Sequence, residues 1–472
     1  MLTYTLKKTP GHPLYEQLYQ SIRDDIAAGR LPAGSRLPSK RVLAAHLGVS
    51  VVTVESAYAQ LLAEGYAEAR PRSGVYVCAI GSSVPVQPPH MPSLPQPPAP
   101  EPLFDLSGGT GEDVPFPASV WVRTMREVIA DKRLMQPVDF AGAPELRAAI
   151  AAHLEQARGL RVSPEQIFIG AGTEYLYGLI VQLLGRRLRY AVEDPGYRKI
   201  SGIYAANDVT VCPIGLDSEG LSVEALRASG AQIAHISPAH HYPTGIVMPI
   251  RRRNALLAWA AEAPERYIIE DDYDSEFRFD TRPLPSLQGM AGADGPVVYL
   301  STCSRSLAPG IRIAYMVLPR QLLGAWQAKY RLYSGTVGRF EQQTLARFIT
   351  GGYFTRHLAR ERTAYKARRD ALVAALRTSF APEELTLAGL HTGLHLLAQL
   401  KDPPPDAALR AAARQYGVRC SLLSDYDLTG TAHSAAGTLV LGYGSLPDAD
   451  CAAAGERLKK LCTAAREASD TV

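Results

Sequence analysis

The chain has 472 residues, more than one hydrophobic core usually spans, so two or three domains are expected. With 46% hydrophobic residues, 20% charged residues and a net charge of +4, the composition is that of an ordinary globular protein. No apolar run is long enough to cross a bilayer, MLTYTLKKTP carries no secretory signal, and six scattered cysteines form no disulfide framework, so we expect a cytoplasmic protein with reduced thiols.

Residues 1–78 form the basic end of the chain, with nine Lys and Arg against six Asp and Glu. A first helix is predicted by apolar residues spaced four apart, Leu14, Leu18, Ile22 and Ile26. After the break LPAGSRLP, Ser39 is a natural N-cap for a second helix, and Gly48 lies where that helix would turn into a third, from about residue 50 to 64. The pattern predicts a helix-turn-helix.

The following segment, YAEARPRSGVYV, predicts two strands around a turn at Ser73 and Gly74, a wing that carries Arg70 and Arg72. A recognition helix fits the major groove of DNA, and basic wing residues neutralise backbone phosphates. The run LPSKRVLAAHLGVSVVTVESAYAQLLAEGY resembles the winged helix of GntR-type bacterial regulators, over about residues 11–78. The resemblance implies double-stranded DNA as a partner.

That resemblance implies a set of DNA-facing positions: Ser39, Arg41, Ser50, Thr53, Tyr58, Arg72 and Gly74. One departure is Val51, which stands where the family usually has arginine. For Thr53 and Tyr58, packing inside the small domain is the alternative.

Residues 79–102 hold nine prolines and predict an extended, semi-rigid linker; a proline-rich ligand for a partner domain is the alternative. Beyond the linker, strand-like runs alternate with helical stretches, which predicts an α/β domain with a mostly parallel sheet. We assign residues 1–78 to the winged helix, residues 103–350 to this large domain and residues 351–472 to a smaller C-terminal α/β subdomain.

Ligand sites on such sheets lie at the carboxyl ends of strands. The segments expected there are GAGTEY, EDPGY, SPAHHYPTG, EDDYDSEF and STCSRSLAPGIR. In this order and spacing they resemble the fold type I aminotransferases, which bind pyridoxal 5'-phosphate. Behind a GntR-type winged helix, the whole chain resembles the MocR subfamily of regulators.

The resemblance implies a role for each motif. Gly172 and Thr173 would open a helix whose backbone N–H groups bind the cofactor phosphate, gripped also by Arg312. Tyr197 would stack on the pyridine ring. Asp271 would hold the proton of the ring nitrogen, and Tyr273 would donate to the 3-oxygen.

The lysine that binds the cofactor covalently is replaced by Arg305. A guanidinium stays protonated, with a pKa above about 12, and cannot act as an amine nucleophile. Pyridoxal phosphate would therefore be held at most noncovalently. Tyr242 also stands at the asparagine of the family's HNPTG pattern, and GTLVLGYGSL has no arginine where the family's carboxylate-binding arginine is expected.

Packing alternatives stay open for this site. Asp271 and Arg305 could form an ion pair that fills it, and Tyr197 and Tyr273 could be packed aromatic residues. His240 and His241 are expected to be structural, so no metal site is predicted.

The leading hypothesis is a homodimeric transcription regulator, not an enzyme, whose large domain senses a small molecule, with a phosphate-bearing one favoured. The first alternative is a pyridoxal phosphate-dependent aminotransferase with an accessory DNA-binding module. The second is a regulator whose large domain is a ligand-free dimerisation scaffold.

Overall fold

The computed structural model describes residues 2–7, 12–80, 103–107, 116–280, 284–430 and 436–470. The chain divides into two compact units, residues 1–99 and 100–472. Nearly all of the predicted linker, residues 81–102, lies outside the described residues. No helix in the described ranges combines the length and apolarity needed to cross a membrane.

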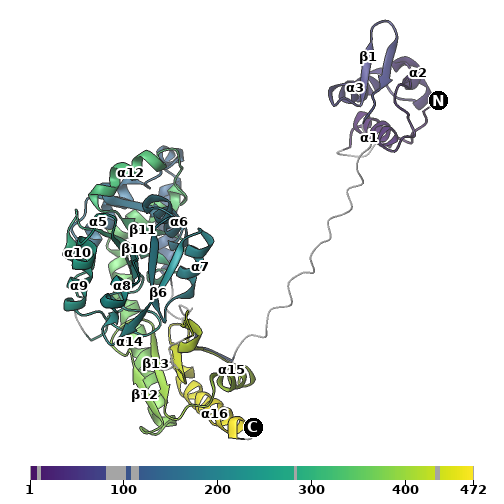
Figure 1. Ribbon diagram of the computed structural model, residues 1–472. Helices are drawn as coiled ribbons and strands as arrows, with labels where there is room; N and C mark the ends of the chain where they lie inside the picture. The colour runs from purple at the N-terminus through teal and green to yellow at the C-terminus, as the bar shows by residue number, and fades with distance from the viewer. Residues whose placement is uncertain are drawn as a thin grey trace. The chain divides into compact units, whose positions relative to one another are not determined.

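The first unit holds three helices and a hairpin (Figure 1), namely α1 (Leu14–Ala27), α2 (Lys40–Leu47), α3 (Val51–Ala63), β1 (Ala67–Arg70) and β2 (Gly74–Val77). Its core contains three of the four residues of the apolar stripe predicted for α1, Leu18, Ile22 and Ile26, whereas Leu14 is only half-buried. Val54 and Leu61 of α3 belong to the same core. The hairpin follows α3 directly, so this unit is the expected winged helix.

A tight turn between α2 and α3 places the two helices in that arrangement. Ser39 caps α2 by accepting a hydrogen bond from the Val42 backbone N–H at 3.4 Å. Gly48 ends α2 in the left-handed region at φ 66°, which favours glycine. Ser50 then caps α3 by accepting from the Thr53 N–H at 3.1 Å.

The second unit is built on an eight-stranded sheet with the order β4-β11-β10-β9-β8-β5-β6-β7. The strands from β10 across to β6 run parallel, while β11 and β7 are antiparallel to their neighbours. The mostly parallel sheet is thus confirmed. Its strands are β4 (Ile167–Gly170), β5 (Arg189–Asp194), β6 (Thr210–Asp217), β7 (Gly220–Leu221), β8 (Ile233–Ile236), β9 (Tyr267–Asp272), β10 (Val297–Thr302) and β11 (Ala314–Val317).

Helices cover both faces of this sheet, because alternate strand residues point to opposite sides and both sets are apolar (Figure 1). In β5, Val192 packs with one helix layer and Ala191 with the other. The first layer comprises α6 (Thr173–Leu184), α7 (Arg198–Ala206) and α12 (Arg320–Tyr330). Away from it lie α5 (Pro144–Arg158), α8 (Val223–Ala228), α9 (Ile250–Ala261), α10 (Leu287–Ala291) and α13 (Arg339–Thr350).

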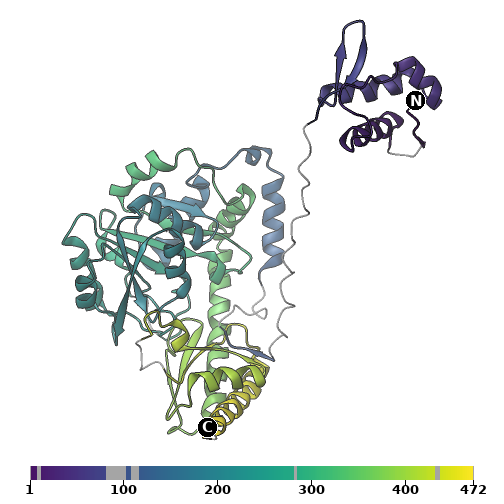
Figure 2. The same cartoon turned by 45° about the vertical axis from the view of Figure 1, so that its right-hand side comes forward.

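The long helix α14 (Tyr353–Ser379) leads from the large sheet into a smaller C-terminal part (Figure 2). That part is a four-stranded sheet with the order β12-β13-β16-β15, packed with α14, α15 and α16. Its elements are β12 (Leu385–Ala388), β13 (His395–Leu400), α15 (Asp406–Gln415), β15 (Ser421–Leu422), β16 (Thr438–Gly442) and α16 (Cys451–Asp470).

One pairing joins segments far apart in sequence: β3 (Phe104–Asp105) runs parallel to β14 (Val418–Arg419). The first described residues of the second unit therefore lie against its C-terminal part. The remaining elements are the helix α4 (Ala118–Ile129), the short helix α11 (Cys303–Ser306), and the 3-10 helices Lys132–Met135, Pro164–Gln166, Leu423–Tyr426 and Asp448–Asp450.

Candidate functional site

The winged helix presents basic side chains at two places. Arg41 on α2 and Arg72 at the tip of the wing are both exposed. Arg72 has a left-handed backbone, φ 58°, and Gly74 has φ 124°. A Cβ atom on Gly74 would lie 3.0 Å from the Nε of Arg36, an exposed arginine that the sequence argument passed over because it precedes α2.

Two of the expected DNA-facing residues have structural tasks. Tyr58 is buried, 1% exposed, and its hydroxyl donates to the Pro38 carbonyl at 2.9 Å. The prediction that Tyr58 faces DNA is therefore wrong, because the ring fills the core between α2 and α3. Thr53 is half-buried, and its Oγ1 lies 2.8 Å from Ser50 Oγ within the cap of α3.

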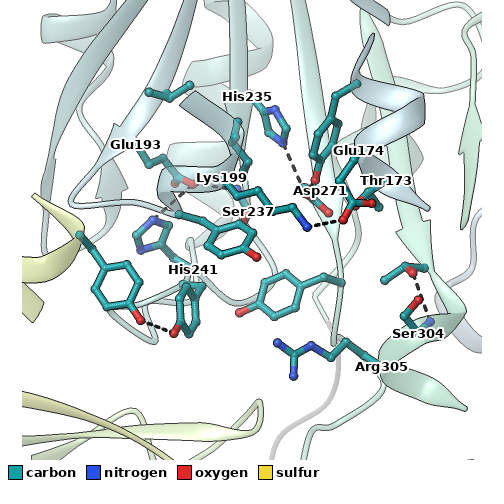
Figure 3. A pocket seen from close by; sticks show the side chains of 18 of the residues that line it. Thr173, Glu174, Glu193, Lys199, His235, Ser237, His241, Asp271, Ser304 and Arg305 are labelled. Carbon is teal, nitrogen blue, oxygen red and sulfur yellow. Dashed lines mark hydrogen bonds and ion pairs between the residues drawn. The ribbon is translucent and has the colours of Figure 1, made fainter. Parts of the chain in front are cut away.

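In the second unit, a cavity of about 420 Å³ lies where β5, β8, β9 and β10 end. Figure 3 shows it from close by. Six of the seven predicted ligand residues line this cavity: Thr173, Tyr197, Asp271, Tyr273, Arg305 and Arg312. The seventh, Gly172, is the N-cap residue of α6 beside it. The segments predicted to meet at the strand ends therefore do so.

The N-terminus of α6 and Arg312 form a cradle with the chemistry of a phosphate site. Gly172 has φ 95°, and a Cβ atom there would lie 2.3 Å from Arg312 Nη2, so only glycine leaves room. Backbone N–H groups at a helix start are suited to an anion. Ser304 of α11 also lines the cavity, and its backbone N–H donates to the side chain of Thr302, the N-cap residue of that helix.

Asp271 ends in the cavity from β9. Its Oδ2 accepts a short hydrogen bond from the Tyr177 hydroxyl and lies 3.4 Å from His235 Nε2. Its Oδ1 is buried, and no described residue donates a hydrogen bond to it. A buried carboxylate oxygen without a donor is costly, so a ligand N–H is the group expected to complete it.

The two predicted aromatic residues differ in exposure. Tyr197 is 46% exposed and meets Tyr242 edge-on, with ring centroids 5.8 Å apart, so a ring face is accessible. Tyr273 places its hydroxyl 3.2 Å from His240 Nδ1, and burial raises its pKa, which keeps the hydroxyl protonated. Both residues line the cavity.

Arg305 is half-buried on α11 and faces the same cavity. Among the described residues, Asp271 is paired with Tyr177 and His235, and no ion pair joins it to Arg305. Figure 3 shows the guanidinium of Arg305 well apart from Asp271. The ion pair that would close the site is thus absent from the described part of the chain.

Two buried titratable residues of the cavity, Glu193 and His241, are shifted toward their neutral forms. Burial raises the pKa of Glu193 to about 8, although the Ser237 backbone N–H donates to it at 2.9 Å. Burial also lowers the pKa of His241 to about 3. His240 and His241 are held by Asp274 and Thr244 respectively, at 2.8 and 2.7 Å, as structural histidines would be.

Several lining residues were missed by the sequence argument. Lys199 and Glu174 form an ion pair inside the cavity, and Tyr426 joins its hydroxyl to that of Tyr242 at 2.6 Å. Glu174 lies inside the GAGTEY segment and Lys199 lies two residues after Tyr197, so a position within or just after a motif was the available signal. Tyr426 comes from the C-terminal part, where no motif marks it.

These contacts fit pyridoxal phosphate in two respects and not in a third. The cradle at Gly172 and Arg312 suits a phosphate, and the open oxygen of Asp271 suits a protonated ring nitrogen. Such a group, when bound, would supply an electron-withdrawing ring. The amine needed for a covalent link is missing at Arg305.

Known proteins match both units. Residues 14–77 match the family described as bacterial regulatory proteins, gntR family, and residues 105–428 match aminotransferase class I and II. The multiple substrate aminotransferase of Thermococcus profundus has the same fold, with a TM-score of 0.69, 24% identity, and coverage of 78% of this chain and 93% of that chain. Fold and site together define a helix-turn-helix regulator with an aminotransferase-like domain.

Relatives named as transcriptional regulators match most of the length of this chain. The uncharacterized HTH-type transcriptional regulator YdeL of Bacillus subtilis is 36% identical, over 98% of each chain. The probable rhizopine catabolism regulatory protein MocR of Rhizobium meliloti is 32% identical over 87% of each, and the HTH-type pyridoxine biosynthesis transcriptional regulator PdxR of Corynebacterium glutamicum is 32% identical over 91% of each. The chain belongs to the MocR subfamily of GntR-type transcriptional regulators.

Proposed function

We propose that this regulator binds a phosphorylated pyridoxal-type molecule noncovalently and that occupancy of the site controls its action on DNA. The observation that carries the proposal is the buried Oδ1 of Asp271, which lacks a donor among the described residues and borders a cavity that also holds the Gly172–Arg312 cradle. A ligand with a ring N–H and a phosphate would donate to Asp271 Oδ1 and place its phosphate in the cradle.

Each lining residue has a task in this proposal. Asp271 accepts the ring N–H, Tyr197 offers a ring face for stacking, and Tyr273 donates to the ring oxygen. Thr173 and Arg312 bind the phosphate. Arg305 adds a fixed positive charge but no nucleophile, so the ligand stays exchangeable, as a sensor requires.

The same replacement weighs against the alternative function, an aminotransferase with an accessory DNA module. Transamination needs a neutral amine that can link covalently to the cofactor. The guanidinium of Arg305 stays protonated and cannot serve as that amine. The name of the Corynebacterium relative refers to pyridoxine biosynthesis. That name supports a vitamin B6 compound as the class of ligand for this chain.

For DNA binding, the proposal uses exposed arginines of the winged helix and the start of α3, where Thr53 is half-buried. Arg41 and Arg72 contact phosphates, and the start of α3 at Ser50 and Thr53 enters the major groove. We also propose a homodimer, because a dimer presents two recognition helices to two half-sites.

The test is a titration of the full chain with pyridoxal 5'-phosphate, followed by dialysis, or by borohydride reduction and peptide mass spectrometry. We expect a saturable absorbance change, complete loss of ligand on dialysis and no reduced adduct on any site peptide. An adduct on Lys199, the lysine that lines the cavity, would contradict noncovalent binding. No saturable signal at millimolar ligand would instead support the ligand-free scaffold.

A further inference from the structure

Arg312 of the phosphate cradle and the neighbouring Lys199 are both paired with a carboxylate of the chain itself, that of Glu174. Glu174, the second residue of α6, places Oε2 2.7 Å from Arg312 Nη2, and its Oε1 accepts a short hydrogen bond from Lys199 Nζ. Figure 3 shows the Lys199–Glu174 pair across the cavity from Arg305. The Glu174 carboxylate thus bridges two cations, Arg312 just before β11 and Lys199 on α7.

The position of this carboxylate overlaps the space an anion would use. A Cβ atom on Gly172 would lie 2.7 Å from Glu174 Oε2 and 2.3 Å from Arg312 Nη2, so both groups stand directly over the start of α6. A phosphate bound to that helix end would meet the carboxylate first.

The carboxylate is ionised and able to move. Burial raises the pKa of Glu174, but hydrogen bonds from Lys199, from its own backbone N–H and from Arg312 outweigh burial and lower it to about 2. Its side chain is 31% exposed, and those of Lys199 and Arg312 are 47% and 51% exposed. These exposures leave all three side chains room to change rotamer toward solvent.

We propose that Glu174 is a built-in competitor for the phosphate: it occupies Arg312 and Lys199 until a phosphate ester displaces it, and Lys199 then becomes a second phosphate-binding cation. This inference rests on the proposed function, because it assumes that the cavity takes a phosphorylated ligand. A dianionic ester near neutral pH gains two cations on displacement, whereas a neutral vitamer has nothing to offer them. Glu174 therefore raises the concentration of a phosphate ester needed to fill the site, and it narrows the difference in affinity between phosphorylated and unphosphorylated ligands.

The test compares Glu174→Gln with wild type in the full chain, by the dissociation constant for pyridoxal 5'-phosphate and for unphosphorylated pyridoxal. Glutamine keeps the shape but removes the charge, so affinity for the phosphate ester should rise about tenfold while that for pyridoxal is unchanged. Glu262→Gln is the matched control, because Glu262 also bridges two cations, Arg227 and Arg266, and does not line the cavity. It should leave both constants unchanged.

A second substitution tests the role of Lys199. In the Glu174→Gln background, Lys199→Met should weaken binding of the phosphate ester several-fold, and Glu174→Ala repeats the gain if glutamine disturbs folding. Equal or weaker binding of pyridoxal 5'-phosphate by both Glu174 variants overturns this inference while the proposed function stands. Absence of binding by wild type and by both variants overturns the proposed function together with it.

Discussion

At the scale of single residues, the site is marked by a buried carboxylate oxygen of Asp271 that receives no hydrogen bond from the described residues. Tyr177 and His235 fix one oxygen of Asp271, and the other stays buried without a donor from the described residues. Such an arrangement points the carboxylate at the cavity and holds it there. Tyr58 shows the opposite case, because its hydroxyl is fully used by Pro38.

Replacing Asp271 with asparagine keeps the shape and removes the charge. We expect binding of pyridoxal 5'-phosphate to weaken by about tenfold or more, because the ring N–H loses a charge-assisted hydrogen bond. Binding of inorganic phosphate, which uses only the cradle, should not change. Calorimetry with both ligands measures the two effects, and equal losses for both would show that the substitution disturbed the whole cavity.

The Tyr58→Phe variant separates packing from DNA contact. The Pro38 carbonyl loses its donor, so the free energy of unfolding of the first unit should fall by about 1 kcal/mol. Hydrogen exchange of the α2 and α3 amides in the full chain measures this change. At temperatures where the first unit stays folded, DNA affinity should be unaffected. A large loss of affinity there would restore a DNA-facing role for Tyr58.

At the scale of elements, two helix starts do the binding work in this account. The start of α3 is capped by Ser50 and presented beside the wing, and the start of α6 opens at Gly172 beneath Arg312. Both were predictable from sequence, because serine caps and glycine turns leave local patterns. The burial of Tyr58 was not, because its position on α3 leaves open which way the ring points until the partner helices are placed.

The basic residues of the winged helix allow a test of the assigned surface. Arg41→Ala and Arg72→Ala should each weaken DNA binding and lower the slope of log affinity against log salt by roughly one, as expected for one lost phosphate contact. Fluorescence anisotropy over a salt series provides both values. Arg320→Ala, on α12 of the second unit, is the control. Unchanged slopes in both wing and helix variants would move the DNA surface elsewhere.

At the scale of the whole molecule, the order of motifs predicted the architecture well. Winged helix, mostly parallel sheet and C-terminal subdomain all appear, because each motif is local and the crossover rules of parallel sheets bring the strand ends together. Contacts between distant segments were beyond reach. Two examples are the contact of Tyr426 with Tyr242 and the bridge that Glu174 forms between Lys199 and Arg312. Both depend on tertiary packing, which no regular spacing in the sequence reveals.

The proposed homodimer can be tested at this scale. Two winged helices on one dimer would match half-sites separated by whole turns of DNA, about 10 base pairs or a multiple. Light scattering of the full chain at micromolar concentration, with and without DNA, should give twice the chain mass for the protein. A monomer under both conditions would contradict the dimer and the two-half-site mode of binding.

The measurement that bears most directly on the central claim uses Arg305→Lys. If the cavity is a pyridoxal phosphate site that lacks only its amine, incubation of this variant with the ligand, reduction with borohydride and mass spectrometry should yield an adduct at position 305. Wild type should bind reversibly and yield none, and Arg320→Lys, a surface change on α12, should behave as wild type. An adduct on the wild-type peptide that contains Arg305, or no binding by either wild type or Arg305→Lys, would contradict the account.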